Sequence, residues 1–556
     1  MAMSKKRLLI VGGVAGGASC AARARRMSEE AEIILFERGP FVSFANCGLP
    51  YHVGGVIPEE GSLLVATPEL LQNRFKIQVR LRHNVEGIDR AKHEISVRNL
   101  ETGEVSREHY DVLVLSPGAA PFIPNVSGNN LPGIFVVRSI QDSRDILSFM
   151  AKNNPQKAVV AGGGFIGLEM AENLHHKGLS VTMVEMLPQL MPPLDPEMAV
   201  FLQDHLASHG VTLFLGERVM GFAQKPEGGI AVALGTGRAL DADMVVLAVG
   251  VRPESGLAAE AGLLPGENGG ILVDAYMRTS DPDIFAVGDA VQVRGRLFDD
   301  ARLVALAGPA NLQGRIAADT IMSPENERPG FSGSLGTFVC GVMGMTVAGT
   351  GECEKSLKRL GAVYEKIYCH PYHHATYYPG AASMTLKLLF SPEDGRILGA
   401  QAVGGPGVDK RMDVISMAIQ KNGTVFDLES AQLCYAPQFG SAKDPVNIAG
   451  MVAANTVRGL VRLVRWEDIG STQALVLDVR TPVERAMGHV PGSLHIPLDS
   501  LRDRLHELPR DREIWAYCAA GQRSYYAVRI LAQHGFMVRN LSGGYAMYRA
   551  FSRRAA

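Results

Sequence analysis

Short apolar runs that end in glycine turns recur along the first half of the chain. Residues 7–11 (Arg-Leu-Leu-Ile-Val) form an apolar run typical of a buried parallel strand, and after a glycine turn an alanine-rich segment extends to about Met27. A second apolar run, Glu32–Glu37, follows it. This order predicts a strand–helix–strand unit, the building block of a parallel sheet.

The same order returns at Lys157–Ala161. A glycine turn, a helical segment to about Lys177 and a second apolar run, Ser180–Glu185, follow one another there. Two further runs, Asp111–Gly118 and Asp243–Gly250, each predict a strand that ends in a turn and resemble the connections that carry a chain between two such units. The pattern therefore predicts two dinucleotide-binding units in one chain.

A different pattern begins after about residue 331, where these glycine turns stop. Apolar runs at Thr385–Phe390 and Ile397–Val403 precede a helical segment near Lys410–Gln420, which indicates an α+β domain. A short, partly basic stretch ends at Arg465, and a second α/β pattern follows it. The chain thus changes its architecture at least twice.

Composition and charge exclude several classes of protein. The chain has 556 residues, which is too many for one core, and its 46% hydrophobic and 20% charged residues are typical of a globular protein. A net charge of -2 gives no overall case for nucleic acid or for an anionic membrane surface, and we expect neither partner. Seven cysteines are an odd number and unlike the dense framework of a secreted domain, so we expect reduced thiols and a cytoplasmic location.

The glycine turn of the second unit carries a complete dinucleotide fingerprint. Gly162, Gly164 and Gly167 follow a strand and open a helix, with Glu185 eighteen residues after the last glycine. The first glycine allows the tight turn, the second lets the backbone approach a pyrophosphate, and the third permits close packing. Because a carboxylate at Glu185 accepts hydrogen bonds from ribose hydroxyls and repels a 2′-phosphate, we expect NADH rather than NADPH.

The first unit departs from this fingerprint, because Val14 occupies the position of the second glycine. A second motif, Thr279–Asp289, resembles the second FAD motif of flavoproteins with two dinucleotide domains, and in that family the aspartate matching Asp289 contacts the ribityl chain. The two motifs together predict an FAD site. Its expected residues are Gly12, Ala15, Gly17, Glu37 and Asp289.

A single cysteine, Cys47, lies just after the first unit in the segment Ser43–Tyr51. Flavin-dependent disulfide reductases place a Cys-x4-Cys pair here, but the positions five before and five after are Val42 and His52, so no disulfide of that kind forms. A lone thiol beside a flavin either attacks an external sulfur atom or becomes a sulfenic acid with peroxide. Single-cysteine NADH peroxidases and oxidases generally have histidine at the position of Ala15, which favours thiol exchange here.

The glycine turn and the Cys47 segment together resemble the coenzyme A disulfide reductase and NADH-dependent persulfide reductase family, over about residues 5–450. The resemblance implies a homodimer in which Cys47 forms a mixed disulfide with coenzyme A, while Tyr377 and Tyr435 reach Cys47 from the partner subunit. Coenzyme A would be bound by Ser19, Arg23, Arg26, Ser43, Asn46 and Lys443.

Two sets of side chains, a pair of arginines and a histidine cluster, have simpler alternative interpretations. Arg23 and Arg26, one turn apart on a helix, suit a phosphate-rich ligand but also occur on any solvated helix face. His370, His373 and His374 with Cys369 would suit a metal only if a second set of ligands closed the site; since none appears, we expect no metal.

The end of the chain resembles a rhodanese domain. Asp478–Glu484 and Gly488–Pro497 resemble its two structural signatures, and Cys518–Ser524 resembles its active loop. A cysteine between a strand and a helix lies among backbone N–H groups, which stabilise a thiolate or persulfide. Cys518 is therefore the expected persulfide carrier, with Arg523 balancing its charge, although many domains of this kind are inactive.

These observations predict an α/β protein with four domains. They are a discontinuous Rossmann-like FAD-binding domain (1–153 and 248–330), a Rossmann-like NAD-binding domain (154–247), an α+β dimerisation domain (331–452), and, after a linker (453–464), an α/β rhodanese-like domain (465–556). The expected activity is reduction of coenzyme A persulfide, polysulfide or coenzyme A disulfide by NADH through FAD. The alternatives are an NADH oxidase or peroxidase that uses a Cys47 sulfenate, and a redox-sensing interaction protein.

Overall fold

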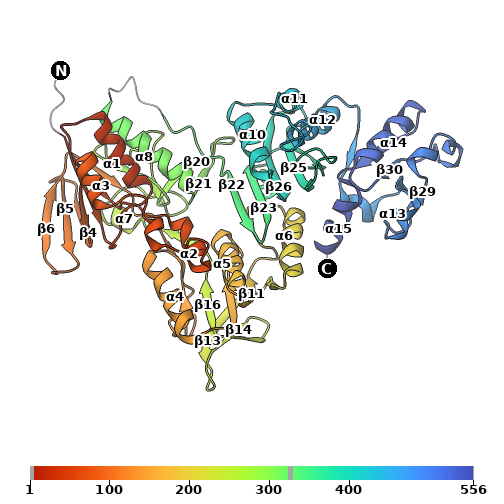
Figure 1. Ribbon diagram of the computed structural model, residues 1–556. Coiled ribbons are helices and arrows are strands. Elements are labelled where there is room, and N and C mark those ends of the chain that lie inside the picture. Colours follow the sequence, from red (N-terminus) through yellow and green to blue (C-terminus); the bar gives the residue numbers. More distant parts are fainter. Residues whose placement is uncertain (1–5, 324–329, 555–556) are drawn as a thin grey trace. The chain divides into compact units, whose positions relative to one another are not determined.

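The computed structural model describes residues 6–323 and 330–554. Its internal contacts divide the chain into two compact units, which we call the N-terminal unit (1–186 and 216–336) and the C-terminal unit (187–215 and 337–556) (Figure 1). In the described ranges no helix has both the length and the apolar character needed to cross a bilayer.

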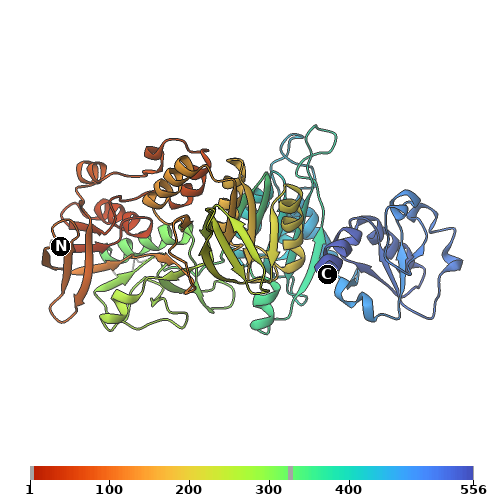
Figure 2. The same ribbon diagram turned by 90° about the horizontal axis from the view of Figure 1, so that it is seen from below.

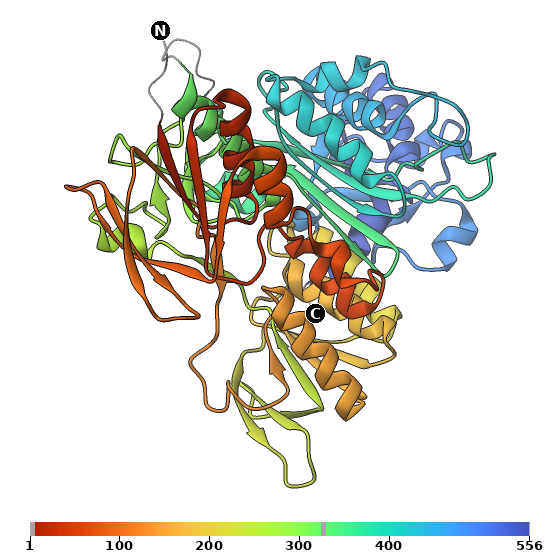
Figure 3. The ribbon, with the colours of Figure 1, turned by 60° about the vertical axis from the view of Figure 1, so that its left-hand side comes forward.

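The first sheet of the N-terminal unit is parallel and has the strand order β19-β7-β1-β2-β3. Its strands are β1 (Arg7–Val11), β2 (Glu32–Glu37), β3 (Gln78–Leu81), β7 (Val112–Leu115) and β19 (Ile284–Ala286). Helix α1 (Gly16–Met27) lies alongside α8 (Ala307–Met322), drawn in red and green in Figure 3. Buried Leu, Ile and Val side chains of the central strands form the core under these helices.

A second parallel sheet of this unit contains the strands in the order β11-β10-β16-β9. They are β9 (Ile134–Phe135), β10 (Lys157–Ala161), β11 (Ser180–Glu185) and β16 (Met244–Leu247), and α5 (Phe165–His176) connects β10 to β11. Helix α2 (Leu49–Gly54) packs against α5 and α4 (Ile140–Asn153). The chain also forms two three-stranded antiparallel sheets, β4 (His83–Asp89), β5 (Glu94–Asn99) and β6 (Val105–His109), and β13 (Val219–Gln224), β14 (Ile230–Leu234) and β15 (Ala239–Ala242).

The C-terminal unit contains an antiparallel sheet with the order β22-β23-β26-β25-β24. Its strands are β22 (Phe338–Val342), β23 (Met345–Gly351), β24 (Glu365–Cys369), β25 (Met384–Phe390) and β26 (Ile397–Gly404). Helix α10 (Val408–Gln420) packs on β23 and β26, and α12 (Pro445–Val457) packs on β24 and β25. Helix α6 (Pro196–Ser208) also contacts β23 and β26.

The last residues form their own parallel sheet, with the order β27-β31-β30-β28-β29 (blue in Figure 2). The strands are β27 (Leu463–Val464), β28 (Leu475–Asp478), β29 (Leu494–His495), β30 (Ile514–Tyr517) and β31 (Val538–Leu541). Helices α13 (Pro482–Ala486), α14 (Gln522–Gln533) and α15 (Gly544–Arg554) connect or follow them.

The observed elements confirm the predicted α/β fold class, with two parallel Rossmann-type sheets, an antiparallel α+β sheet and a final α/β sheet. In the final sheet, α14 begins at Gln522, directly after Gly521, which adopts a left-handed φ of +98° at the N-cap position.

Candidate active site

The first glycine turn has no room for side chains at two of its predicted positions. Gly12 has a φ of +93°, and a Cβ atom there would lie 2.0 Å from the Ser116 carbonyl oxygen. A Cβ on Gly17 would lie 1.9 Å from the Gly12 carbonyl oxygen. Only glycine lets the start of α1 approach β1 this closely, and a helix N-terminus held at such a turn favours the negative charge of a pyrophosphate.

Two carboxylates extend this turn into a site that fits FAD. Glu37, at the end of β2, accepts hydrogen bonds from the backbone N–H groups of Gly13 at 2.9 Å and Gly39 at 2.8 Å. Desolvation raises the pKa of the half-buried Asp289, while the nearby Arg138 opposes that rise. Such carboxylates suit the ribose and ribityl hydroxyls of a flavin dinucleotide.

One cavity of 1220 Å³ joins most of the predicted N-terminal residues. Its volume exceeds the ~300–1,000 Å³ of an ordinary small-molecule pocket, which suits a ligand larger than an ordinary small molecule. The flavin candidates along it are Gly12, Ala15, Glu37 and Asp289; Gly17 lies behind this surface. The sulfur-site candidates along it are Ser19, Arg23, Arg26, Ser43, Asn46 and Cys47.

Cys47 presents an exposed thiol in this cavity, in the short 3-10 turn Asn46–Gly48 before α2. Desolvation raises the pKa of the thiol, and the negative charges of Glu169 and Asp289 raise it further. Cys20 on α1 differs from Cys47: burial raises the pKa of its thiol to about 12, which makes it an inert core residue. Cys47 is therefore the accessible thiol of the cavity.

Glu169 is a site residue that the sequence did not reveal. It lies on α5, where the Tyr51 hydroxyl donates a hydrogen bond to its Oε1 at 3.5 Å. Burial, the largest cause, raises the pKa of Glu169 to about 7. Since no local motif marks a carboxylate on this helix, only the packing of α2 on α5 shows that its charge acts on Cys47.

The predicted coenzyme A residues are already engaged in part. Arg23 Nε lies 2.5 Å from Asp319 Oδ1 on α8, and the Ser19 hydroxyl hydrogen-bonds Asn311. With its amide oxygen turned toward Arg138, Asn46 accepts a hydrogen bond from Arg138 Nη1 at 2.6 Å. An anionic ligand would therefore compete with Asp319 for Arg23.

The second glycine turn repeats the geometry of the first. Gly162 has a φ of +109°, and a Cβ there would lie 2.2 Å from the Ala248 carbonyl oxygen; one on Gly167 would lie 2.0 Å from the Gly162 carbonyl oxygen. A Cβ at Gly164 would meet nothing within 4 Å, which leaves the turn open to a ligand. Glu185 Oε2 accepts the N–H of Gly163 at 2.6 Å, so its carboxylate lies beside the turn and fits NADH.

In the C-terminal unit, the two predicted tyrosines meet. Their hydroxyl groups lie 2.8 Å apart, although Tyr377 is 73% exposed and Tyr435 is 50% exposed. The hydrogen bond to Tyr435 raises the pKa of Tyr377. Lys443 is also exposed, so the C-terminal unit presents two phenols and an ammonium group to solvent.

Cys518 follows β30 and lies in a loop that ends at the start of α14. The thiol is 1% exposed, and its Sγ accepts the backbone N–H of Gly521 at 3.1 Å. The Ser524 hydroxyl also donates to Sγ, at 3.6 Å. Because N–H groups at a helix start favour negative charge, this loop suits a thiolate or persulfide.

Arg523, which we expected to balance the charge of Cys518, is bound by the carboxylate of Glu484, the last residue of the first rhodanese-like signature. Its Nη1 lies 2.7 Å from Glu484 Oε2, and this contact is the largest cause that lowers the pKa of Glu484 to about 2. The rest of that signature is structural: Arg480 and the Tyr517 hydroxyl each bind the buried Asp478 carboxylate at 2.8 Å.

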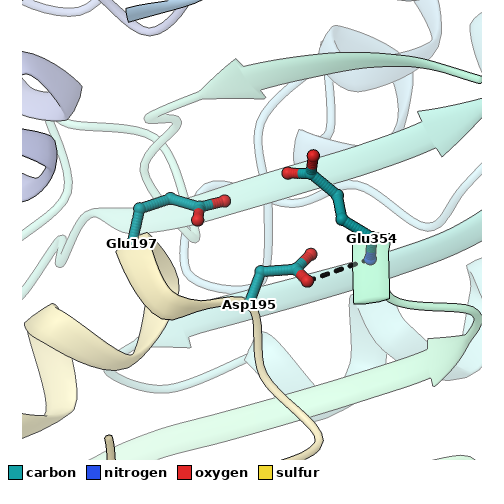
Figure 4. Close-up of side chains that lie close together, drawn as sticks. All are labelled: Asp195, Glu197 and Glu354. Atoms are coloured by element: carbon teal, nitrogen blue, oxygen red, sulfur yellow. Dashed lines mark hydrogen bonds between the residues drawn. The ribbon is translucent and has the colours of Figure 1, made fainter. Parts of the chain in front are cut away.

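Three carboxylates, Asp195, Glu197 and Glu354, lie close enough together to suggest a cation site (Figure 4). The Nζ atom of Lys387 contacts all three, with 2.7 Å to Asp195 Oδ2. The ammonium group therefore occupies the place of a cation. Lys366 extends the network, with Nζ 2.9 Å from Glu354 Oε1 and 2.7 Å from Glu467 Oε1.

Three family models match the chain. Residues 6–308 match the pyridine nucleotide-disulphide oxidoreductase model, residues 338–444 match the dimerisation domain of these enzymes, and residues 465–550 match the rhodanese-like domain. A coenzyme A disulfide reductase of Staphylococcus epidermidis is 33% identical over 80% of this chain and 99% of its own. An NADH oxidase of Methanocaldococcus jannaschii is 33% identical over 80% of this chain and 97% of its own.

Two solved structures match nearly the whole chain. The structure of reduced Bacillus anthracis CoADR-RHD is 45% identical, covers 99% of both chains and superposes with a TM-score of 0.96. That of an NAD-dependent persulfide reductase from A. fulgidus is 36% identical, covers 98% of this chain and 100% of its own, and gives a TM-score of 0.90.

Proposed function

The chain belongs to the pyridine nucleotide-disulphide oxidoreductase family, and from this premise we propose that it uses NADH and FAD to reduce coenzyme A persulfide, polysulfide or coenzyme A disulfide at Cys47. The observation that carries the proposal is the single cavity that joins the exposed Cys47 thiol, the flavin candidates and the cationic candidates for a phosphate-rich ligand. The rhodanese-like domain favours a sulfane-sulfur substrate over a simple disulfide.

Cys47 acts as the nucleophile. Its thiolate attacks the inner sulfur of coenzyme A persulfide, which releases hydrosulfide and forms a mixed disulfide between Cys47 and coenzyme A. FAD, when bound, supplies the route by which two electrons from NADH reach this disulfide. Reduction returns the Cys47 thiolate and, with one proton, the coenzyme A thiol. Glu169, whose pKa is about 7, is placed to hold or release a proton near Cys47.

Cys518 supplies the sulfane sulfur in this scheme. Its persulfide would pass the terminal sulfur atom to a coenzyme A thiolate, which yields coenzyme A persulfide and the free Cys518 thiolate. The N–H of Gly521 and the guanidinium of Arg523 support both anionic forms of Cys518. A reductase of simple disulfides has no need for such a group.

We further propose a homodimer with the four-domain division given above, in the cytoplasm. The match to the dimerisation domain supports the dimer, and the exposed Tyr377 and Tyr435 are the residues that would act on the partner's cavity. The described cysteines are all free thiols, which supports a reducing compartment.

The test is anaerobic NADH oxidation by the FAD-loaded protein with coenzyme A persulfide, coenzyme A disulfide or hydrogen peroxide. We expect faster turnover with the persulfide than with the disulfide, and loss of both in Cys47→Ser. Cys518→Ser should keep turnover of added coenzyme A persulfide, because its cysteine acts before that substrate. Turnover with hydrogen peroxide but with neither sulfur substrate would contradict the proposal.

An NADH oxidase or peroxidase activity is the second candidate, because of the matching NADH oxidase. Ala15 lies on the cavity wall in the first glycine turn and has no group that could transfer a proton to a sulfenate or peroxide. Peroxide-dependent or oxygen-dependent NADH oxidation that requires Cys47 would favour this candidate.

A further inference from the structure

The turn between β31 and α15, residues Ser542–Tyr545, lies between the antiparallel sheet and the Cys518 loop. On the sheet side, Ser542 Oγ accepts the backbone N–H of Tyr368 at 3.1 Å. The Ser542 carbonyl accepts the indole N–H of Trp466 at 2.8 Å. The turn is thus held by β24 and by the segment that enters the rhodanese-like domain.

Two consecutive glycines make this arrangement possible. Gly543 and Gly544 have left-handed φ values of +72° and +62°. A Cβ on Gly543 would lie 2.7 Å from the Cβ of Tyr368 on β24. A Cβ on Gly544 would lie 2.5 Å from the carbonyl oxygen of Cys518. One glycine therefore packs directly on the sheet, and the next packs directly on the active loop.

Backbone hydrogen bonds fix the loop to the turn. The N–H of Tyr545 donates to the Cys518 carbonyl at 2.7 Å, and the N–H of Ala546 donates to the Ala519 carbonyl at 3.0 Å. These bonds fix the carbonyl groups of Cys518 and Ala519 at the start of the loop. The N–H of Gly521 therefore meets Cys518 Sγ on a backbone that the turn holds in place.

His370 binds the turn from the sheet side. Its Nε2 lies 3.0 Å from the Gly543 carbonyl oxygen, and its Nδ1 lies 3.0 Å from the Thr385 hydroxyl. Since a carbonyl oxygen only accepts, Nε2 carries the proton and Nδ1 accepts from Thr385, so one neutral tautomer satisfies both contacts. Burial lowers the pKa of His370 to about 4, which keeps that tautomer at neutral pH.

We propose that His370 is a positioning residue for sulfur transfer at Cys518: by binding the Gly543 carbonyl it couples the docking of the rhodanese-like domain to the geometry of the active loop. The inference rests on the proposed role of Cys518. It adds a residue of the dimerisation domain, outside the rhodanese-like sequence, to the determinants of that reaction.

The test compares the full-length protein with His370→Phe, which removes the donor, and His370→Gln, which restores a donor at the same end of the side chain. Thiosulfate and cyanide are the probes: Cys518 takes the outer sulfur and releases sulfite, and cyanide then removes that sulfur as thiocyanate. We expect kcat to fall about tenfold in His370→Phe with little change in KM, and to recover largely in His370→Gln. Amide exchange of the Gly521–Ser524 segment should accelerate in parallel.

Matched controls keep the outcomes distinct. His373→Phe alters a histidine of the same segment that hydrogen-bonds Ala382 and His374 and should leave thiocyanate formation within about twofold. If His370→Phe does not fold, Ser542→Ala removes the hydrogen bond that the Tyr368 N–H of β24 donates to the turn and is expected to show the same two effects. Unchanged exchange and unchanged kcat in the folded variant would overturn the coupling. No thiocyanate from the wild type would contradict the role of Cys518, while the exchange comparison would still decide the coupling.

Discussion

At the scale of single residues, the site combines groups that a motif reveals with groups that only packing reveals. Cys47 and Cys518 stand in recognisable segments, and the structure places Cys47 in the cavity and Cys518 Sγ beside the N–H of Gly521. Glu169 has no such signal, and the sequence showed His370 only as part of a histidine cluster without a second set of metal ligands. Glu169 acts on Cys47 because α2 packs on α5, and His370 binds a carbonyl 173 residues later in the chain.

Replacing Glu169 with glutamine should increase the reactivity of Cys47. The charge of Glu169 raises the pKa of the thiol, so its removal lowers that pKa and increases the thiolate fraction. Because the pKa of Glu169 is about 7, the difference from wild type should be small at pH 6 and grow to about threefold above pH 7. Alkylation of the Cys47 peptide by iodoacetamide, followed by mass spectrometry across this range, measures the change.

The exposed Cys434 provides an internal control in the same samples, because its alkylation should not respond to Glu169→Gln. An equal change at both cysteines, or slower alkylation of Cys47, would show that Glu169 does not set the reactivity of the thiol.

At the scale of elements, glycine turns and apolar runs were enough to predict β1, α1, β10 and α5, since each is determined locally. The ion network around Lys387 could not be predicted. Its carboxylates come from the N-cap and first turn of α6 and from α9 (Glu354–Arg359), far from β25 in sequence, and a lysine in a strand usually indicates an exposed face. The four-domain boundaries and the roles of the site residues stay predictions.

Lys387→Met should destabilise the C-terminal unit by about 3–5 kcal/mol, because it leaves three buried carboxylates without their shared cation. These carboxylates raise the pKa of Lys387 above its ordinary value, so the wild-type contribution is complete at neutral pH and is lost only at strongly alkaline pH. In the variant, the carboxylates bind protons more tightly when folded. Its stability should therefore decrease from pH 5 to pH 8 relative to wild type.

Urea unfolding, followed by tryptophan fluorescence, measures this change selectively, since both tryptophans, Trp466 and Trp515, lie in the C-terminal unit. Lys358→Met is the matched control: its side chain is 67% exposed and 3.9 Å from Glu354, so we expect less than about 0.5 kcal/mol. A similar loss of unfolding free energy in both variants, or no pH dependence in Lys387→Met, would contradict a stabilising role of the buried ion network around Lys387.

At the scale of the whole molecule, the proposed function requires residues that the chain presents to solvent. Tyr377 and Tyr435 share a hydrogen bond on an exposed surface of the C-terminal unit, whereas Cys47 lies in the N-terminal unit. The resemblance to coenzyme A disulfide reductases would explain this exposure, because there the two phenols are expected to reach Cys47 of the second subunit. The active molecule would then be the dimer.

Subunit complementation tests this arrangement. Cys47→Ser should not turn over coenzyme A persulfide, and the double variant Tyr377→Phe/Tyr435→Phe should turn it over slowly. A heterodimer isolated through two different affinity tags should have one intact site and show about half of the wild-type activity. A heterodimer no more active than its parents would place the tyrosines at the Cys47 of their own chain. Adding Cys47→Ser to the double variant provides the inactive control.

The glycine pair at Gly543 and Gly544 also determines how freely the last domain can be exchanged during evolution or engineering. Since a Cβ at Gly543 would collide with Tyr368, a homologous tail with a larger residue there could not be grafted onto this sheet without shifting its own catalytic loop. The tail is therefore portable only if it keeps glycine at this position. Domain shuffling would have to preserve the glycine pair wherever the receiving sheet carries a side chain at the position of Tyr368.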